Sequence, residues 1–96
     1  MMQAIEERID HIDEEIRGAM EYAEKYVVFK KTRPQWAQLY HDMAVQELNH
    51  AENLKDIAQE AMDEYSYIPE EDAEKWREKQ KLHAEKKAMV KLLLTK

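Results

Sequence analysis

The scarcity of helix-breaking residues is the feature that most constrains the fold of this chain. Its 96 residues include one glycine and two prolines, so tight hairpin turns and glycine-rich phosphate loops have almost no residues from which to form. The breaks fall at two places: Thr32-Arg33-Pro34, which fits a cap followed by proline in a first helical turn, and residues 66–71, where proline again precedes acidic residues. We therefore expect a single all-α domain over residues 1–96, with helices at about 3–31, 34–65 and 70–94.

Apolar residues recur at spacings of three and four in the first two helices, as they do on one face of an α-helix. The first helix carries Ile5, Ile9, Ile12, Ile16, Ala19, Ala23, Tyr26 and Val27. The second carries Trp36, Leu39, Tyr40, Met43, Leu54, Ile57, Ala58, Ala61 and Tyr65. The short turn between them predicts an antiparallel hairpin, with the third helix added at its C-terminus. Because so small a domain buries only about 60–65% of its unfolded surface, we expect a partner subunit to complete the core.

Charge and composition exclude several classes of function. The net charge is −6, from 21 acidic and 15 basic residues, which argues against nonspecific binding to nucleic acid. The chain has no cysteine, so disulfides, thiolate metal sites and a cysteine nucleophile are excluded. No apolar run approaches the roughly 18 residues that span a membrane, and residues 1–10 lack the features of a signal peptide. A cytoplasmic protein that binds neither membrane nor nucleic acid is expected.

Two polar residues interrupt the apolar stripe of the second helix. Glu47 and His50 lie between Met43 and Leu54 and point within about 60° of each other. An unpaired carboxylate on a buried face destabilises a protein by roughly several kcal/mol, whereas a Glu and a His three residues apart can bind one cation together. The sequence favours a metal site over the two alternatives, a surface Glu–His pair and an ion pair inside a dimer.

The first helix should supply a further carboxylate to such a site. With the turn near residues 31–34, the hairpin places residues 14–19 opposite Glu47 and His50. Glu15, at the edge of the apolar stripe, is the best candidate, and Glu21 is the second in case the register slips. The alternative for Glu15 is an exposed residue paired with Arg8 or a lysine.

These residues resemble a known family. The segment Glu15-Ile16-Arg17-Gly18-Ala19-Met20-Glu21-Tyr22, followed by Glu47-Leu48-Asn49-His50-Ala51-Glu52, is similar to the ferritin-like superfamily, and most of all to encapsulated half-ferritins with an intersubunit di-iron site. The resemblance covers residues 5–60. A complete ferritin-like site takes a Glu from each of two helices and an ExxH motif from each of two others, so this chain would hold half a site.

The resemblance implies a homodimer or higher homo-oligomer in which two hairpins form a four-helix bundle. Glu15, Glu47 and His50 would be both catalytic and metal-binding, with Glu47 bridging the metals and the other two residues terminal. The bundle would hold two Fe ions per dimer, with Mn or Zn as substitutes. The implied activity is ferroxidase, serving iron storage or detoxification. Encapsulated ferritins often carry a tail that docks in a shell protein, which residues 89–96 match poorly.

Alternatives remain open for the whole chain and for several side chains. A non-enzymatic helical dimerisation or interaction module would use Glu47 and His50 as a buried polar pair that fixes the register. Three tyrosines are expected near the predicted site: Tyr22, Tyr26 and Tyr40. For each of them, a role as an aromatic core residue is favoured over a role as an electron donor. For His83, a satisfied core or surface histidine is favoured over a second metal site. His11 and His41 are expected to be exposed.

Overall fold

The computed structural model describes residues 2–96, with the side chains described from residue 5 onward. It consists of three α-helices, α1 (Met2–Phe29), α2 (Pro34–Asp63) and α3 (Glu70–Leu94), and no strand occurs within residues 2–96. The predicted all-helical fold class is confirmed, and each helix begins and ends within two residues of the position expected from the sequence. No helix in this described part is both long enough and apolar enough to cross a membrane.

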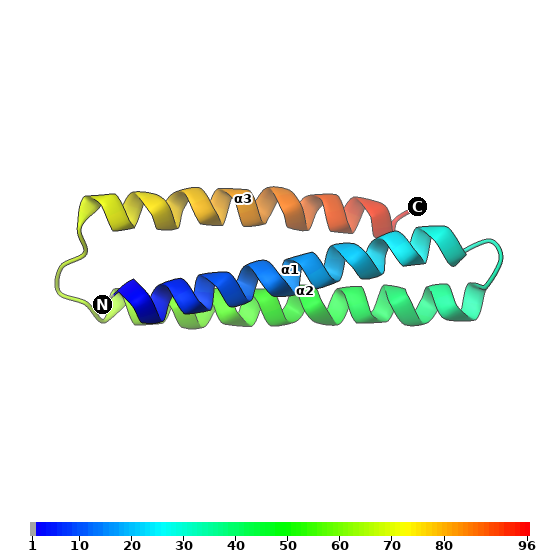
Figure 1. Cartoon of the computed structure of the whole chain (residues 1–96), viewed down its shortest axis with the longest axis horizontal. Coiled ribbons are helices and arrows are strands. Elements are labelled where there is room, and N and C mark those ends of the chain that lie inside the picture. The colour runs from blue at the N-terminus through cyan, green and yellow to red at the C-terminus, as the bar shows by residue number, and fades with distance from the viewer. Residues whose placement is uncertain (1) are drawn as a thin grey trace.

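The three helices form an elongated body of 54 × 17 × 15 Å. In Figure 1, α1 and α2 run antiparallel as the predicted hairpin, and α3 returns along the other side of α1. α1 makes most of its contacts with α2, while the backbone of α3 lies close to α1 and α3 reaches α2 mainly through long side chains. One side of the α1–α2 hairpin is therefore covered by α3.

The helix ends follow from local chemistry. Pro34 opens α2, where its fixed φ suits a first turn, and the preceding Arg33 makes no capping hydrogen bond with its side chain. α3 follows Pro69 and has three acidic residues in its first turn, where the helix dipole favours negative charge: Glu70, Glu71 and Asp72. Thr95 ends α3, and its Oγ1 donates a 2.7 Å hydrogen bond to the carbonyl of Leu92.

The face of α2 that packs against α1 is built from alanines. Ala37, Ala44, Ala51 and Ala58, spaced seven residues apart, are all buried. Because their side chains are small, the two helices can approach closely. A seven-residue repeat of apolar residues is the usual signature of two helices packed along a seam, and this signal in the sequence identifies the buried face.

Several large apolar residues of α2 lie on an adjacent face that a single chain leaves partly uncovered. Trp36 is 49% exposed, Leu39 61% and Ile57 47%. The predicted stripe is buried at Ala58, but the alanine seam to which Ala58 belongs makes the contact with α1 and leaves the neighbouring stripe of larger residues partly exposed. We call this stripe the open face of α2; it consists of Trp36, Leu39, Met43, Glu47, His50, Leu54, Ile57 and Ala61.

The core fills the space between α1 and its two neighbours. At one end, four isoleucines of α1 pack with Ala51, Ala58 and Met62 of α2 and with Trp76 of α3. The isoleucines are Ile5, Ile9, Ile12 and Ile16. At the other end, Val90 of α3 joins a cluster of buried alanines and Leu48. Trp76 Nε1 also donates a 2.9 Å hydrogen bond to Gln59 Oε1 of α2, so α3 is fixed at both ends.

Candidate metal site

The structure brings Glu15 of α1 together with Glu47 and His50 of α2. One ligand atom from each residue lies within 4.8 Å of the other two. The side chain of Glu15 is 17% exposed, that of Glu47 27% and that of His50 57%. The cluster thus lies at the surface of the hairpin, on the open face of α2. Glu21, the second candidate from the sequence, is exposed and stands outside it.

The distances leave room for a cation between the three side chains. His50 Nδ1 is 3.6 Å from Glu15 Oε2 and 3.8 Å from Glu47 Oε1, which is too long for hydrogen bonds. Two ligand atoms bonded to one ion at about 2.1 Å lie at most about 4.2 Å apart. Side-chain shifts of less than about 1 Å would therefore place all three atoms around a single ion.

The electrostatics of the cluster show a deficit of positive charge. Glu15 Oε2 is buried and has no hydrogen-bond partner among the described residues. The pKa of Glu47 is raised above its ordinary value, first by a hydrogen bond with Glu15, then by burial and by the charge of Glu15, while His50 opposes the shift. Two carboxyl groups that favour a shared proton are a fitting place for a cation.

Gly18 lies directly opposite the Glu47 carboxylate. A Cβ atom at this position would stand 3.0 Å from Glu47 Oε2. Gly18 is the one glycine of the chain and sits in the middle of α1. The end of the Glu47 side chain therefore rests against bare α1 backbone, next to Glu15.

A second carboxylate–histidine cluster lies on the other side of α1. His83 is buried, and its Nε2 is 2.6 Å from Asp13 Oδ1. Lys79 Nζ donates a 3.2 Å hydrogen bond to Asp13 Oδ2. His83 is thus a buried core histidine paired through Nε2, as the sequence favoured, although its Nδ1 has no hydrogen-bond partner among the described residues. Sequence reasoning missed Asp13, whose one signal is its position next to Ile12 in the isoleucine stripe.

Of the other histidines and the tyrosines between residues 22 and 40, His11 contacts the candidate site, and the rest pack against one another. His11 is exposed, as expected, and its Nε2 is 3.4 Å from Glu15 Oε1, a contact that the sequence interpretation did not include. His41 was expected to be exposed but is partly buried, because its ring packs edge-on against Tyr26 with centroids 5.2 Å apart. Tyr22 and Tyr40 stack at 6.1 Å, so both tyrosines pack as aromatic residues between the helices.

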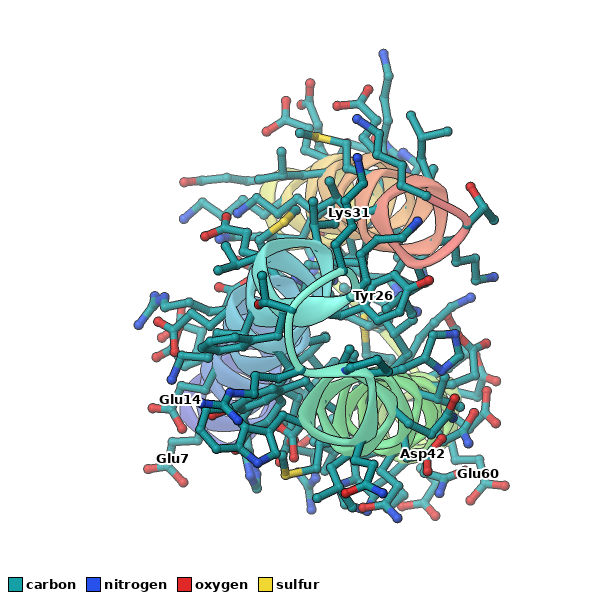
Figure 2. All side chains as sticks on the ribbon, turned by 90° about the vertical axis from the view of Figure 1, so that its right-hand side faces the viewer. Glu7, Glu14, Tyr26, Lys31, Asp42 and Glu60 are labelled. Atoms are coloured by element: carbon teal, nitrogen blue, oxygen red, sulfur yellow. The ribbon has the colours of Figure 1, made fainter. Side chains whose placement is uncertain are left out.

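Other acidic side chains point away from the cluster. In Figure 2, Glu7 and Glu14 leave α1 on one flank of the molecule, and Asp42 and Glu60 leave α2 on the opposite flank. All four are exposed. Because Glu14 is adjacent to Glu15 in the sequence but turned to solvent, it is a matched reference for the carboxylates of the site.

Comparison of the chain with family models, with curated proteins and with solved structures gave no match. The candidate site is therefore defined by the geometry of Glu15, Glu47 and His50 and by the charge that they leave uncompensated.

Proposed function

We propose that this chain is one half of a homodimeric di-iron carboxylate protein that oxidises Fe(II) at a site shared between two subunits. The observation that carries the proposal is the convergence of Glu15, Glu47 and His50 on an uncovered apolar face. It agrees with the function implied by the resemblance to half-ferritins.

The residues present fit a divalent metal. The orphaned Glu15 Oε2 and the raised pKa of Glu47 both indicate that the neighbouring histidines do not fully compensate the charge of the two carboxylates. Carboxylate oxygens with an imidazole nitrogen suit Fe(II) or Mn(II), and Zn(II) can compete for the same ligands. A bound cation would remove the repulsion that the metal-free cluster carries.

A second copy of the chain would complete the site. Three protein donors are half of the four carboxylates and two histidines that a ferritin-like di-iron site uses. The open face of α2 is also nearly symmetric about the midpoint of Glu47 and His50: Met43 and Leu54 are equidistant from it, and so are Trp36 and Ala61. Such a pattern favours two α2 helices packed antiparallel around a two-fold axis, with Glu47 near His50 of the partner subunit.

In such a dimer each part of the chain has a distinct role. Glu15 and Glu47 would hold the metal as carboxylates, and His50 would donate a nitrogen lone pair as a neutral imidazole. The apolar residues on either side of them, such as Met43 and Leu54, would exclude water and fix the two subunits in register. With iron as the substrate, the chemistry is one-electron oxidation of each Fe(II) by dioxygen or peroxide.

The test combines metal binding, assembly and iron oxidation. We expect the wild-type chain to bind about one Fe(II) or Mn(II) per subunit, as half of a two-metal site, to form a dimer and to convert Fe(II) to Fe(III). Metal content by elemental analysis, mass by light scattering and Fe(III) by absorbance would measure these. Glu47→Ala should lower metal affinity about 100-fold or more, whereas Glu14→Ala, which removes the same charge one residue from Glu15, should leave it unchanged.

Two outcomes would overturn the proposal. One is a wild-type protein that binds no Fe, Mn or Zn after expression with these metals. The other is a Glu47→Ala protein that keeps both metal and ferroxidase activity. A dimer that forms without metal and whose melting temperature does not change when a chelator is added would instead support the non-enzymatic interaction module.

A further inference from the structure

We propose that Gly18 is a positioning residue, whose missing side chain gives the Glu47 carboxylate its place beside Glu15. The steric part of this inference stands on the packing of α1 and α2 alone. The part that concerns metal affinity rests on the proposed function. Both parts begin from the fact that the chain has a single glycine and that it lies within a helix.

The backbone gives no reason for a glycine at this position. Gly18 lies in the middle of α1, and its φ angle is not positive, so an L-amino acid would fit the backbone without strain. Alanine has a much higher helix propensity than glycine. A glycine here therefore weakens α1, and its explanation must come from the space that a side chain would fill.

The occupant of that space is Glu47. A Cβ at position 18 would lie 3.0 Å from Oε2 of Glu47, which is too close without a small shift of this oxygen, and in ordinary contact with Cδ at 3.6 Å and Cγ at 3.8 Å. On its other side the carboxylate faces His50 Nδ1 at 3.8 Å. Glu47 is partly exposed, so it can swing into solvent. The helices would then keep their packing, but the Glu47 carboxylate would be displaced from its place beside Glu15.

A Gly18→Ala variant separates this role from a merely structural one. We expect its metal-free melting temperature to equal or exceed that of the wild type, while its affinity for Mn(II), measured by titration calorimetry, falls about tenfold or more. Asn49→Ala is the matched control, because Asn49 is exposed on α2 between the two ligands. This variant also raises helix propensity, and it should leave Mn(II) affinity unchanged. An unchanged affinity in Gly18→Ala would overturn the positioning role.

A double-mutant cycle in the metal-free protein tests the steric claim by itself. In a Glu47→Ala background the space beside position 18 is empty, so Gly18→Ala should raise the melting temperature by about 4–8 °C at fixed protein concentration. In the wild-type background the increase should be smaller, because the Glu47 side chain must move. Equal increases in both backgrounds would overturn the inference. A wild-type protein that binds no Mn(II) would overturn the proposed function, and the cycle would still decide whether Gly18 positions Glu47.

Discussion

Two carboxylates of α1, Asp13 and Glu15, each lie next to a histidine of another helix, yet their surroundings differ. Asp13 faces α3 and meets a histidine that is 2% exposed, with Lys79 on its second oxygen. Glu15 faces α2 and meets a histidine that is 57% exposed, with Glu47 where the first cluster has a lysine. One cluster is closed and balanced in charge, and the other is open and acidic.

The pKa values of the two clusters shift in opposite directions. Burial alone would raise the pKa of Asp13, but hydrogen bonds and charges from His83 and Lys79 outweigh it and hold this pKa below its ordinary value. The pKa of Glu47 is raised first by its interaction with the neighbouring carboxyl group of Glu15 and then by burial. A carboxylate and a histidine therefore stabilise the fold where a lysine accompanies them, as at Asp13. Where a second carboxylate takes the place of the lysine, as at Glu15, they form a candidate set of metal ligands.

The largest effect should come from breaking the closed cluster. Asp13→Ala leaves the buried His83 Nε2 without its 2.6 Å partner, and we expect a loss of about 2–3 kcal/mol in the free energy of unfolding. Urea denaturation of the metal-free protein measures this. Asp10→Ala, at an exposed position of the same helix, should change stability by less than about 0.5 kcal/mol. Equal effects of the two substitutions would show that the Asp13–His83 contact does not hold α3.

Replacing Glu47 of the open cluster by lysine should give Glu15 the kind of cationic neighbour that Asp13 has in the closed cluster. Glu47→Lys places a cation beside the orphaned Glu15 Oε2, so we expect metal-free stability to rise by up to about 1 kcal/mol and metal binding to be lost. The measurements are urea denaturation and metal titration. Glu14→Lys, at the exposed neighbour of Glu15, is the control. A Glu47→Lys protein less stable than wild type would contradict the view that the cluster lacks positive charge.

The two clusters should also oppose each other in their dependence on pH. Asp13 has a lowered pKa in the folded state, so its contribution to stability is present above its ordinary value of 3.8 and is lost as the pH falls through the folded pKa. Glu47 has a raised pKa, so its contribution is present below 4.5 and is lost as the pH rises through the folded pKa. Glu47→Gln should remove only the loss of stability that occurs as the pH rises through the pKa of Glu47, and it should keep the loss at low pH that Asp13 causes. Denaturation at a series of pH values without metal, compared between wild type and variant, checks this difference.

The sequence predicts the open cluster far better than the closed one. Glu47 and His50 are three residues apart on one helix, and the position of Glu15 opposite them follows from the length of one hairpin. The positions of the helix-breaking residues and the geometry of the α-helix are therefore sufficient to predict this cluster. Asp13 and His83 are 70 residues apart, and nothing in their spacing relates them. The buried face of α2 was predicted on the stripe of large apolar residues, whereas α1 packs on the adjacent stripe of alanines, which only its seven-residue repeat distinguishes in the sequence.

The smallest effect tests whether burial, rather than ion pairing alone, gives the closed cluster its strength. Lys87 Nζ of α3 lies 2.6 Å from Glu52 Oε2 of α2, the same separation as between Asp13 and His83, and lowers the pKa of Glu52. Glu52 is 52% exposed, so water can replace the lysine when it is removed. We therefore expect Lys87→Ala to reduce stability by no more than about 1 kcal/mol, and this loss should shrink in high salt. A loss as large as that of Asp13→Ala would mean that α3 is held by its ion pairs in general and not by the buried histidine.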